Sequence, residues 1–455
     1  MLRRRQMAGG TGELAASVTA SHGGEFARLR LRFLHWLLTP GGWAHTTDAA
    51  RLRGWARVLR WHAATTPRQR LHLVRLALWT PVRAWGEARE AVMSFGAEVE
   101  ATSGISAQTQ RRQLWWLAVR YGMNPTSYLD YQLYRPERRR RAQSYLQEDE
   151  FYSVVRWLNH AMSRTDGYPI ADKLAFCEWC GSYALPAIPI LLVYDAVGLN
   201  ASALTDDNIS SLPRCDLFSK PADYTGGHGS ARWCYAGVRG GADRWLGRDG
   251  TVLSSADLLR ELARISHALP RKPGRAPRRM LLQPCIRNHR DLLPLTNAGL
   301  CTVRVVTYRM PGDSARVLLA SYKMPAGDSP ADNFHSGGII APVDLATGKL
   351  GPAIRRQGHV LMRIDRHPDT GVMIPGHQLP YWTETLALAT RALNAGHSRP
   401  SIGWDIAITD HGPILVEGNT MSNPDIAQAP TGIPLSDTPF AAAIDAHVQR
   451  AMELH

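Results

Sequence analysis

One segment constrains the fold of this chain more than any other, GWDIAITDHGPILVEGNTMSNPD, residues 403–425. Two apolar-rich stretches flank Asp410, His411 and Gly412, which are residue types that form tight turns. Apolar runs on both sides of such a turn are typical of a β-hairpin. The segment therefore predicts two antiparallel strands.

Polar side chains on this hairpin are the strongest candidates for a metal site. Successive side chains of a strand point to opposite faces, so Glu417 and Asn419 share a face, and pairing across the turn can bring them level with Asp405. Two carboxylates and an amide oxygen are the ligands that Mg²⁺ (or Mn²⁺) takes when it also bridges phosphates. The alternative interpretation is a hairpin whose acids face solvent.

Secondary-structure patterns divide the rest of the chain. Residues 26–95 and 106–160 carry apolar side chains at helical spacing, which predicts an α-helical N-terminal module. From about residue 168, β-branched runs separated by Gly and Pro predict strands, several of them antiparallel neighbours. Helices are expected among these strands at about 171–182, 255–268 and 380–396. The C-terminal two thirds is therefore mixed α and β.

Composition excludes several classes of protein. The chain has 455 residues, 44% hydrophobic and 20% charged, which argues against disorder and against a disulfide miniprotein. Six irregularly spaced Cys are too few for a disulfide framework. No stretch is apolar enough to span a membrane, and the start lacks the apolar core of a secretory signal. These observations predict a cytoplasmic protein, with peripheral membrane association as a variant.

Positive charge is concentrated in the first third of the chain. Residues 1–150 hold 23 Arg and 12 Asp or Glu, an excess of 11 in a chain whose formal charge is +14. Such a field attracts nucleic acid, an anionic membrane surface or an acidic partner. The absence of a helix-turn-helix, zinc-finger or RNA-binding strand motif argues against nucleic acid. We expect the Arg138–Arg141 run to continue a helix that ends near Glu148.

The N-terminal region is also rich in tryptophan. These residues favour packing in a helical bundle, with an amphipathic membrane platform as the alternative. They are Trp36, Trp43, Trp55, Trp61, Trp79 and Trp85.

A second candidate segment is DLFSKPADYTGGHGS, residues 216–230. A strand through Lys220 leads into a loop that contains Gly226, Gly227 and Gly229. Such a loop can lay backbone N–H groups on phosphates and close as a lid, although the order of a P-loop is absent. A surface turn is the alternative.

Lysine is scarce in this chain. Only five of the 53 basic residues are Lys, namely Lys173, Lys220, Lys272, Lys323 and Lys349. Lys carries a compact point charge, whereas the guanidinium of Arg is a planar fork. Sites that require a compact charge therefore keep Lys even in a chain that otherwise uses Arg.

The order of several segments resembles the ATP-grasp superfamily, and within it the sugar-transfer-associated ATP-grasp proteins, often labelled alpha-L-glutamate ligase-related. The resemblance covers about residues 110–440. Its segments are Asp172-Lys173, ALPAIP, Ser219-Lys220-Pro221 with the glycine loop, LLQPCI, Lys323, GWDIAIT and ILVEGN.

This resemblance implies an α+β fold in which two subdomains clasp ATP, preceded by the α-helical module. Four regions follow from it. They are a basic, Trp-rich helical region (1–110), a helical linker and pre-ATP-grasp segment (111–210), a small subdomain with the lid loop (211–279) and a large subdomain with the metal hairpin (280–455).

Roles for the cations come with the resemblance. It implies that Lys173 and Lys220 contact nucleotide phosphates and that Lys323 is a third cation near the triphosphate. Arg304 is similar to an arginine directed toward phosphate or acyl phosphate. The three metal ligands correspond to Asp405, Glu417 and Asn419.

The strand LLQPCI resembles the hinge that binds adenine with main-chain groups, so Gln283, Pro284, Cys285 and Ile286 are expected to receive the base. Pro284 has no N–H, so the donor must be Cys285 or Ile286. Many superfamily members have Glu where this chain has Gln283.

The implied function is an ATP- and Mg²⁺-dependent ligase that activates a small-molecule carboxylate as an acyl phosphate and couples it to an amine. One alternative is a kinase that phosphorylates a sugar or another hydroxyl compound. Another is a non-catalytic, nucleotide-regulated module that docks on an anionic membrane or polymer.

Other chemistry-bearing residues favour structural roles. Cys177 and Cys180 have CxxC spacing but no second pair, which favours packing. His335 is a candidate base in a segment where substrate could lie, although single loop histidines such as His335 and His377 are usually incidental.

Overall fold

The structure is a computed structural model that describes residues 52–59 and 66–71 in part and most of the chain from residue 80 onward. Within 80–455, the residues outside the description are 163–168, 170–171, 196–197, 201–211, 224–228, 248, 272–276, 297–298, 328–333, 335–336, 421 and 455.

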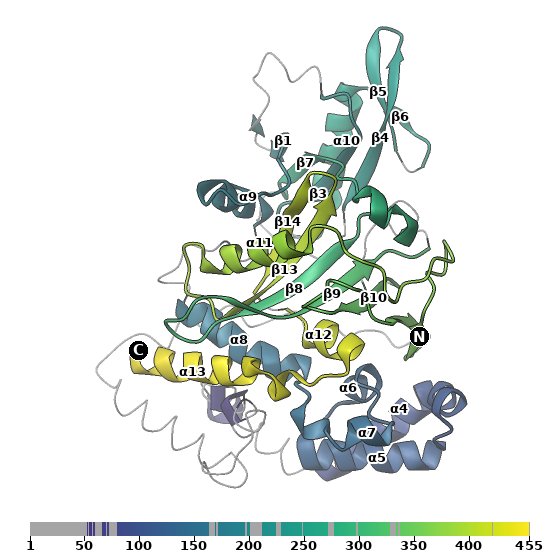
Figure 1. Ribbon diagram of the computed structural model, residues 1–455, viewed down its shortest axis with the longest axis vertical. Helices are drawn as coiled ribbons and strands as arrows, with labels where there is room; N and C mark the ends of the chain where they lie inside the picture. Colours follow the sequence, from purple (N-terminus) through teal and green to yellow (C-terminus); the bar gives the residue numbers. More distant parts are fainter. Residues whose placement is uncertain are drawn as a thin grey trace.

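Two seven-stranded sheets organise the molecule, one above the other in Figure 1. In spatial order, the upper sheet contains β2 (Gly198–Asn200), β1 (Leu192–Asp195), β7 (Met280–Pro284), β3 (Leu217–Pro221), β4 (Ala231–Arg239), β5 (Ala242–Leu246) and β6 (Val252–Leu253). The lower sheet contains β12 (Val360–Ile364), β11 (Ala353–Gln357), β10 (Ile339–Val343), β9 (Arg316–Met324), β8 (Thr302–Tyr308), β13 (Ser401–Thr409) and β14 (Gly412–Asn419). All pairings between these strands are antiparallel.

Helices cover both faces of the lower sheet. Helix α11 (Trp382–Asn394) packs against β8, β9, β13 and β14, and α12 (Pro424–Thr431) packs against β9 and β10. The face under α11 holds the largest apolar core, which includes Trp404, Val303 and Leu388. A smaller cluster with Ile340 and Ile426 lies under α12. Because successive side chains of each strand point to opposite faces, the sheet buries one set of side chains under α11 and the other under α12.

The upper sheet has a separate core. Helix α10 (Ser255–Ala268) begins with a capping box formed by Ser254 and Asp257, and it buries Leu258 and Leu262 against Trp233 and other residues of the sheet. Helix α9 (Lys173–Ser182) belongs instead to the core of the lower sheet through Phe176, Trp179 and Cys180.

The helices before α9 form the lower end of the molecule in Figure 1. They are α4 (Thr80–Ser103), α5 (Ala107–Tyr121), α6 (Pro125–Asp130), α7 (Pro136–Arg139), the 3-10 turn η2 (Ala142–Ser144) and α8 (Glu148–Met162). Helix α8 packs against the last helix, α13 (Pro439–Leu454), which follows the short turn η6 (Leu435–Asp437).

Three details differ from the expectations. Glu148 begins a helix instead of ending one, because carboxylates in a first turn are stabilised by the helix dipole. Strand β7 pairs with β1 and β3 of the upper sheet. The expected boundary between the two subdomains, at residues 279 and 280, would instead place β7 with the lower sheet. The stretch 106–160 is broken into several helices by Gly122 and Pro136.

The tryptophans at the start of the chain fall largely outside the described residues. Trp36, Trp43, Trp61 and Trp79 are not described, Trp55 is buried and donates to Asp445 of α13 at 2.6 Å, and Trp85 is exposed. Among the described residues, no helix is both long and apolar enough to cross a membrane.

Candidate active site

The predicted hairpin is confirmed as β13 and β14, joined by Asp410 and His411. Near the turn the register pairs Ile406 with Leu415, and beyond it Asp405 lies opposite Glu417. A β-bulge between Asp405 and Ile406 produces this one-residue shift. Without it, Glu417 would lie opposite Trp404 and point into the core under α11, because a one-residue slip exchanges the faces of a strand.

Asp405 is the centre of a buried ion cluster. The guanidinium of Arg304, on β8, binds both carboxylate oxygens, with Nε–Oδ1 2.7 Å and Nη2–Oδ2 2.9 Å. Lys323 Nζ, from β9, lies 3.1 Å from Oδ1. All three side chains are buried. Burial alone would raise the pKa of Asp405, but the charges of Arg304 and Lys323 together outweigh it and hold that pKa below its ordinary value.

Two further residues shape this cluster. Ser422 Oγ accepts from Nη1 of Arg304 at 3.3 Å. Gly403 leaves the required space, because a Cβ there would lie 2.5 Å from Ser422 Oγ and 3.1 Å from Arg304 Cδ. The sequence analysis missed both residues, although Gly403 lies two positions before Asp405 and therefore on its face of the strand.

Lys173 is the first residue of α9. Asp172 caps the helix by accepting from the N–H groups of Leu174 and Ala175 at 2.9 and 3.2 Å, and Arg279 pairs with the same carboxylate. The N–H of Lys173 donates to Ala222 O at 2.8 Å, which ties the helix to the end of β3. The lysine therefore sits at a fixed junction of helix and sheet.

The charge of Glu417 acts on both lysines that the resemblance assigns to phosphate. Burial lowers the pKa of Lys173 and of Lys220, and the carboxylate of Glu417 opposes the shift for each. In addition, Leu415 N of β14 donates to Pro186 O, in the segment after α9, at 2.8 Å. Glu417 thus acts electrostatically on Lys173 of α9 and on Lys220 of the upper sheet, while Asp405 opposite it binds Arg304 and Lys323 of the lower sheet.

The predicted hinge is strand β7 and the residues after it. Gln283 is buried, and its Nε2 donates to Ile188 O at 3.2 Å. The N–H of Cys285 donates to Asp216 O at 2.9 Å. Of the two donors considered for adenine, Cys285 is therefore engaged within the sheet, and Ile286 is the candidate.

The glycine loop is described only in part. Gly226, Gly227 and His228 lie outside the described residues. Gly229 has φ +76°, and a Cβ there would lie 2.9 Å from Leu269, so both conformation and packing favour glycine.

The three candidate ligands on the hairpin are oxygen-bearing side chains, the type that binds divalent cations. Asn419 Nδ2 donates to Glu417 Oε1 at 3.0 Å, so these two oxygen-bearing side chains already lie together. Asp405 has both oxygens in contact with cations. Within the described part of the chain, no three His, Cys, Asp or Glu side chains gather as a metal site; the hairpin offers two carboxylates and an amide.

The remaining candidates have structural surroundings or are not described. Cys180 is buried in the main core, where burial raises its pKa to about 12, and Cys177 lies against Ile188 O. His377 contacts Asp291 O at 3.0 Å. His335 lies outside the described residues.

Comparison with known proteins gives one family match. A family model described as sugar-transfer associated ATP-grasp matches residues 157–438, more than half of the chain. A comparison with curated proteins found no match.

Solved structures of low identity also resemble the chain. D-alanyl-alanine synthetase A from Vibrio cholerae is 12% identical, with a TM-score of 0.35 over 62% of this chain and 65% of that one. D-alanine–D-alanine ligase from Bacillus anthracis is 10% identical, with a TM-score of 0.34 over 62% and 69%. D-cycloserine synthetase is 12% identical, with a TM-score of 0.32 over 72% and 82%. The chain thus spans slightly less than two thirds of the first of these proteins.

Proposed function

The chain belongs to the sugar-transfer-associated ATP-grasp family, and on that premise we propose that it is an ATP-dependent ligase that joins a carboxylate to an amine. One observation carries the proposal. Arg304 and Lys323 bind Asp405 directly, and Glu417, which lies opposite Asp405 on the hairpin, acts electrostatically on Lys173 and Lys220. A structural hairpin has no need of this set.

In the first step, a carboxylate oxygen of the substrate attacks the γ-phosphorus of ATP. The bond from that phosphorus to the β,γ-bridging oxygen breaks, and ADP leaves with the electron pair. Lys173 and Lys220 would oppose the charge that develops on the phosphates. The N–H of Ile286 would orient the adenine ring. Positioning and electrostatics suffice for this step, so no side-chain nucleophile is required.

In the second step, the amine attacks the carbonyl carbon of the acyl phosphate, loses a proton and expels inorganic phosphate. Arg304 and Lys323 would stabilise the oxyanion and the leaving phosphate. The bonds of Arg304 to Asp405 and Ser422 would pre-orient its guanidinium for that role.

Glu417 and Asn419 would hold a divalent cation, and Asp405 would complete the set by exchanging one of its contacts. Such an ion supplies Lewis-acid neutralisation of phosphate charge when bound. The bonds that form and break in the substrates are the same whichever of Asp405, Glu417 and Asn419 would bind the cation.

The proposal is tested by ATP turnover over a panel of carboxylic acids, amines and sugars, with hydroxylamine present to trap acyl phosphates. A hydroxamate formed with one acid would support carboxylate activation. ADP release with a sugar and without hydroxamate would favour phosphoryl transfer to a hydroxyl group instead.

A pair of lysine variants makes the test specific. Lys220→Ala should lower turnover by on the order of 10²-fold, because a phosphate-neutralising charge is removed. Lys349→Ala, at an exposed lysine between β10 and β11, should leave turnover unchanged. Equal turnover of both variants would contradict the assignment.

A further inference from the structure

The outward side of helix α5 combines arginine with exposed aromatic and aliphatic residues. The helix has no acidic residue, and its inner side buries Gln110, Leu114 and Leu117. Arg112, Trp116, Val119 and Arg120 are exposed; Trp116 is 45% and Val119 41% exposed. Apolar side chains of this size on the surface of a cationic helix are an amphipathic pattern turned toward solvent.

Helix α4 extends this surface. Its buried side is rich in alanine, whereas Val82 and Trp85 on the other side are 66% and 45% exposed. The Trp85 ring lies 6.4 Å from that of Trp115, and the Arg111 guanidinium lies 4.9 Å from the Trp85 centroid. Trp115 in turn donates to Pro81 O at 3.0 Å, so the two helices hold these rings in place.

We define the α4–α5 face by its exposed members, Val82, Trp85, Arg112, Trp116, Val119 and Arg120. We propose that this face docks on an anionic lipid bilayer. Tryptophan favours the boundary between headgroups and acyl chains, where its ring is buried and its N–H stays polar. Arginine gains from the negative surface potential, and valine from leaving water.

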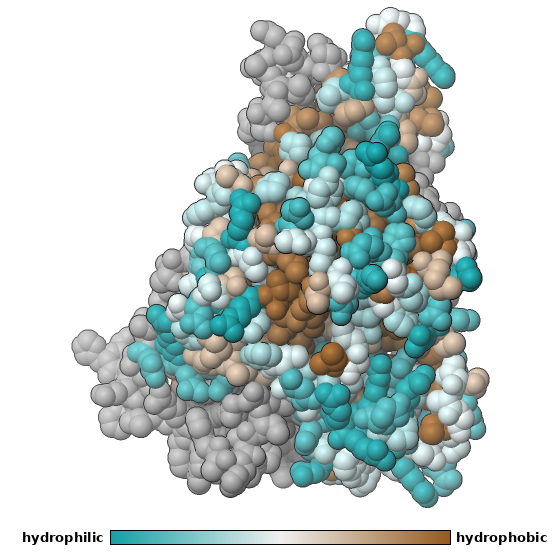
Figure 2. Space-filling view, in the orientation of Figure 1, coloured by the Kyte–Doolittle hydropathy of each residue, from teal (hydrophilic) through white to brown (hydrophobic). Residues whose placement is uncertain are grey.

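Lipid explains this combination better than other anionic partners. Nucleic acid or an anionic polymer would use the arginines but leave Val82 and Val119 in water. An acidic protein would satisfy both, and it becomes an outcome of the test below. Figure 2 shows hydrophilic side chains gathered over the visible side of this end of the molecule.

The face is rigidly connected to the candidate active site. Glu98 of α4 pairs with His359 at 2.8 Å, and Gln132 donates to Leu361 O at 2.9 Å. Asp130 pairs with Arg356. These contacts fix the helices to β11 and β12 of the lower sheet, so docking would hold the hairpin of Asp405 and Glu417 at a set height above the lipid surface.

The test is co-sedimentation of the full chain with vesicles of phosphatidylcholine alone and of phosphatidylcholine mixed with phosphatidylglycerol. We expect binding to the mixed vesicles that weakens with salt. Arg112→Glu with Arg120→Glu should weaken it by at least about tenfold, since each charge near an anionic surface contributes separately. Val82→Ser with Val119→Ser should also weaken it, without changing ATP binding or the melting temperature.

Matched variants on the upper half serve as controls. Arg260→Glu with Arg264→Glu, and Val238→Ser with Val252→Ser, alter residues of similar exposure away from the face and should bind like the wild type. The proposal fails if the wild type does not bind the mixed vesicles. It also fails if binding survives both pairs of changes on the α4–α5 face. A soluble acidic protein that competes for the face in the absence of lipid binding would assign it to that partner.

Discussion

Asp405 shows at the residue scale how a buried carboxylate can be stable away from water. Arg304 binds both of its oxygens and Lys323 binds one, so its charge is compensated at short range. The same contacts orient the two cations that the proposed reaction would use at the acyl phosphate. If that proposal is right, stability and turnover depend on the same three side chains.

Asp405→Asn should lower the free energy of unfolding by about 3 kcal/mol, because removal of one partner leaves buried charges uncompensated. Urea unfolding measures this loss. Asp410→Asn, in the exposed turn of the same hairpin and beside Arg290, should cost far less, because solvent screens an exposed ion pair. Equal losses for the two variants would contradict a structural role for the buried cluster.

Acid should also act through Asp405. Its pKa is held below the ordinary value in the folded protein, so the ionised carboxylate, bound by Arg304 and Lys323, stabilises the fold above about pH 4. This contribution is lost as the pH falls further, toward the pKa of the folded state. The slope of stability against pH in that range should be shallower for Asp405→Asn than for the wild type.

The buried lysines predict a second pH dependence. Burial lowers the pKa of Lys220, so its charge is lost at a lower pH than that of an exposed lysine, whose pKa is about 10.4. ATP affinity should therefore fall as the pH rises through the alkaline range below that value. Lys220→Arg keeps its charge and should flatten the dependence, measured by titration calorimetry. Identical pH profiles would show that Lys220 does not contact the phosphates.

At the scale of elements, the cap of α9 positions Lys173, one of the lysines proposed to contact phosphate. The carboxylate of Asp172 satisfies two N–H groups of the first turn, directly beside Lys173. A helix cap of this kind stabilises a protein by about 1 kcal/mol. Here it also fixes the backbone of the first turn, where Lys173 begins the helix.

Asp172→Ala should lower stability by about 1 kcal/mol and weaken ATP binding several-fold. Ser254→Ala removes the cap of α10, which carries no candidate site residue, and should cost similar stability with no effect on ATP. Thermal melts and nucleotide titration separate the two effects. Equal ATP affinity in both variants would limit Asp172 to a structural role.

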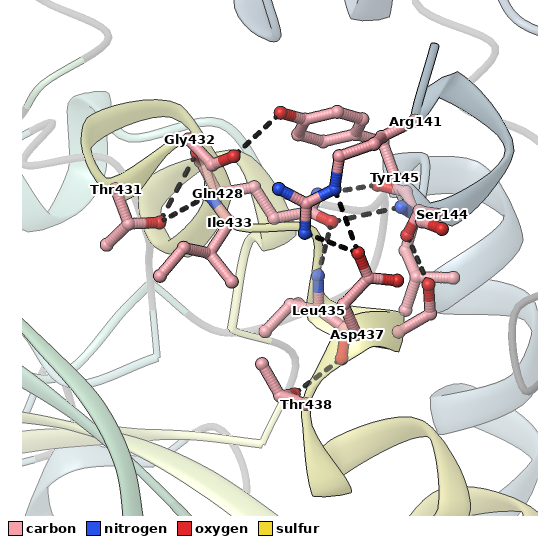
Figure 3. A network of polar contacts seen from close by, with 12 residues as sticks. Arg141, Ser144, Tyr145, Gln428, Thr431, Gly432, Ile433, Leu435, Asp437 and Thr438 are labelled. Carbon is pink, nitrogen blue, oxygen red and sulfur yellow. Dashed lines mark hydrogen bonds and ion pairs between the residues drawn. The ribbon is translucent and has the colours of Figure 1, made fainter. Parts of the chain in front are cut away.

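At the scale of the whole molecule, the helical module is joined to the C-terminal region by a polar network (Figure 3). Gln428 of α12 is fully buried; its Oε1 accepts from Leu146 N and Leu435 N, and its Nε2 donates to Leu146 O, all near 3 Å. Arg141 pairs with Asp437 beside it.

Gln428→Leu should destabilise the protein by about 3 kcal/mol, because it leaves the buried N–H groups of Leu146 and Leu435 unsatisfied, whereas Leu146 O keeps its bond from the Tyr131 hydroxyl. Limited proteolysis should then cut first around residues 142–147. Gln449→Leu, whose amide bonds only Asp445 within α13, should cost less than about 1 kcal/mol. A melt for Gln428→Leu that matches this control would show that the network does not hold the module in place.

The sequence by itself determined much of the element content and the fold class. Strand alternation predicted β8, β9, β13 and β14, and the Asp410-His411-Gly412 turn predicted their hairpin, because these signals are local and the backbone responds to them directly. The family match confirms the ATP-grasp fold that the order of segments implied.

Tertiary structure decided the rest. The bulge that turns Glu417 toward Asp405 depends on burying Trp404 under α11, a contact between distant parts of the chain. Local propensity likewise does not select the observed neighbours over others. Examples are the pairing of β7 with β1 and β3 and the contact of Ser422 with Arg304. Local sequence fixes the period of a strand, whereas its register and its neighbours are selected by which faces the whole molecule can bury.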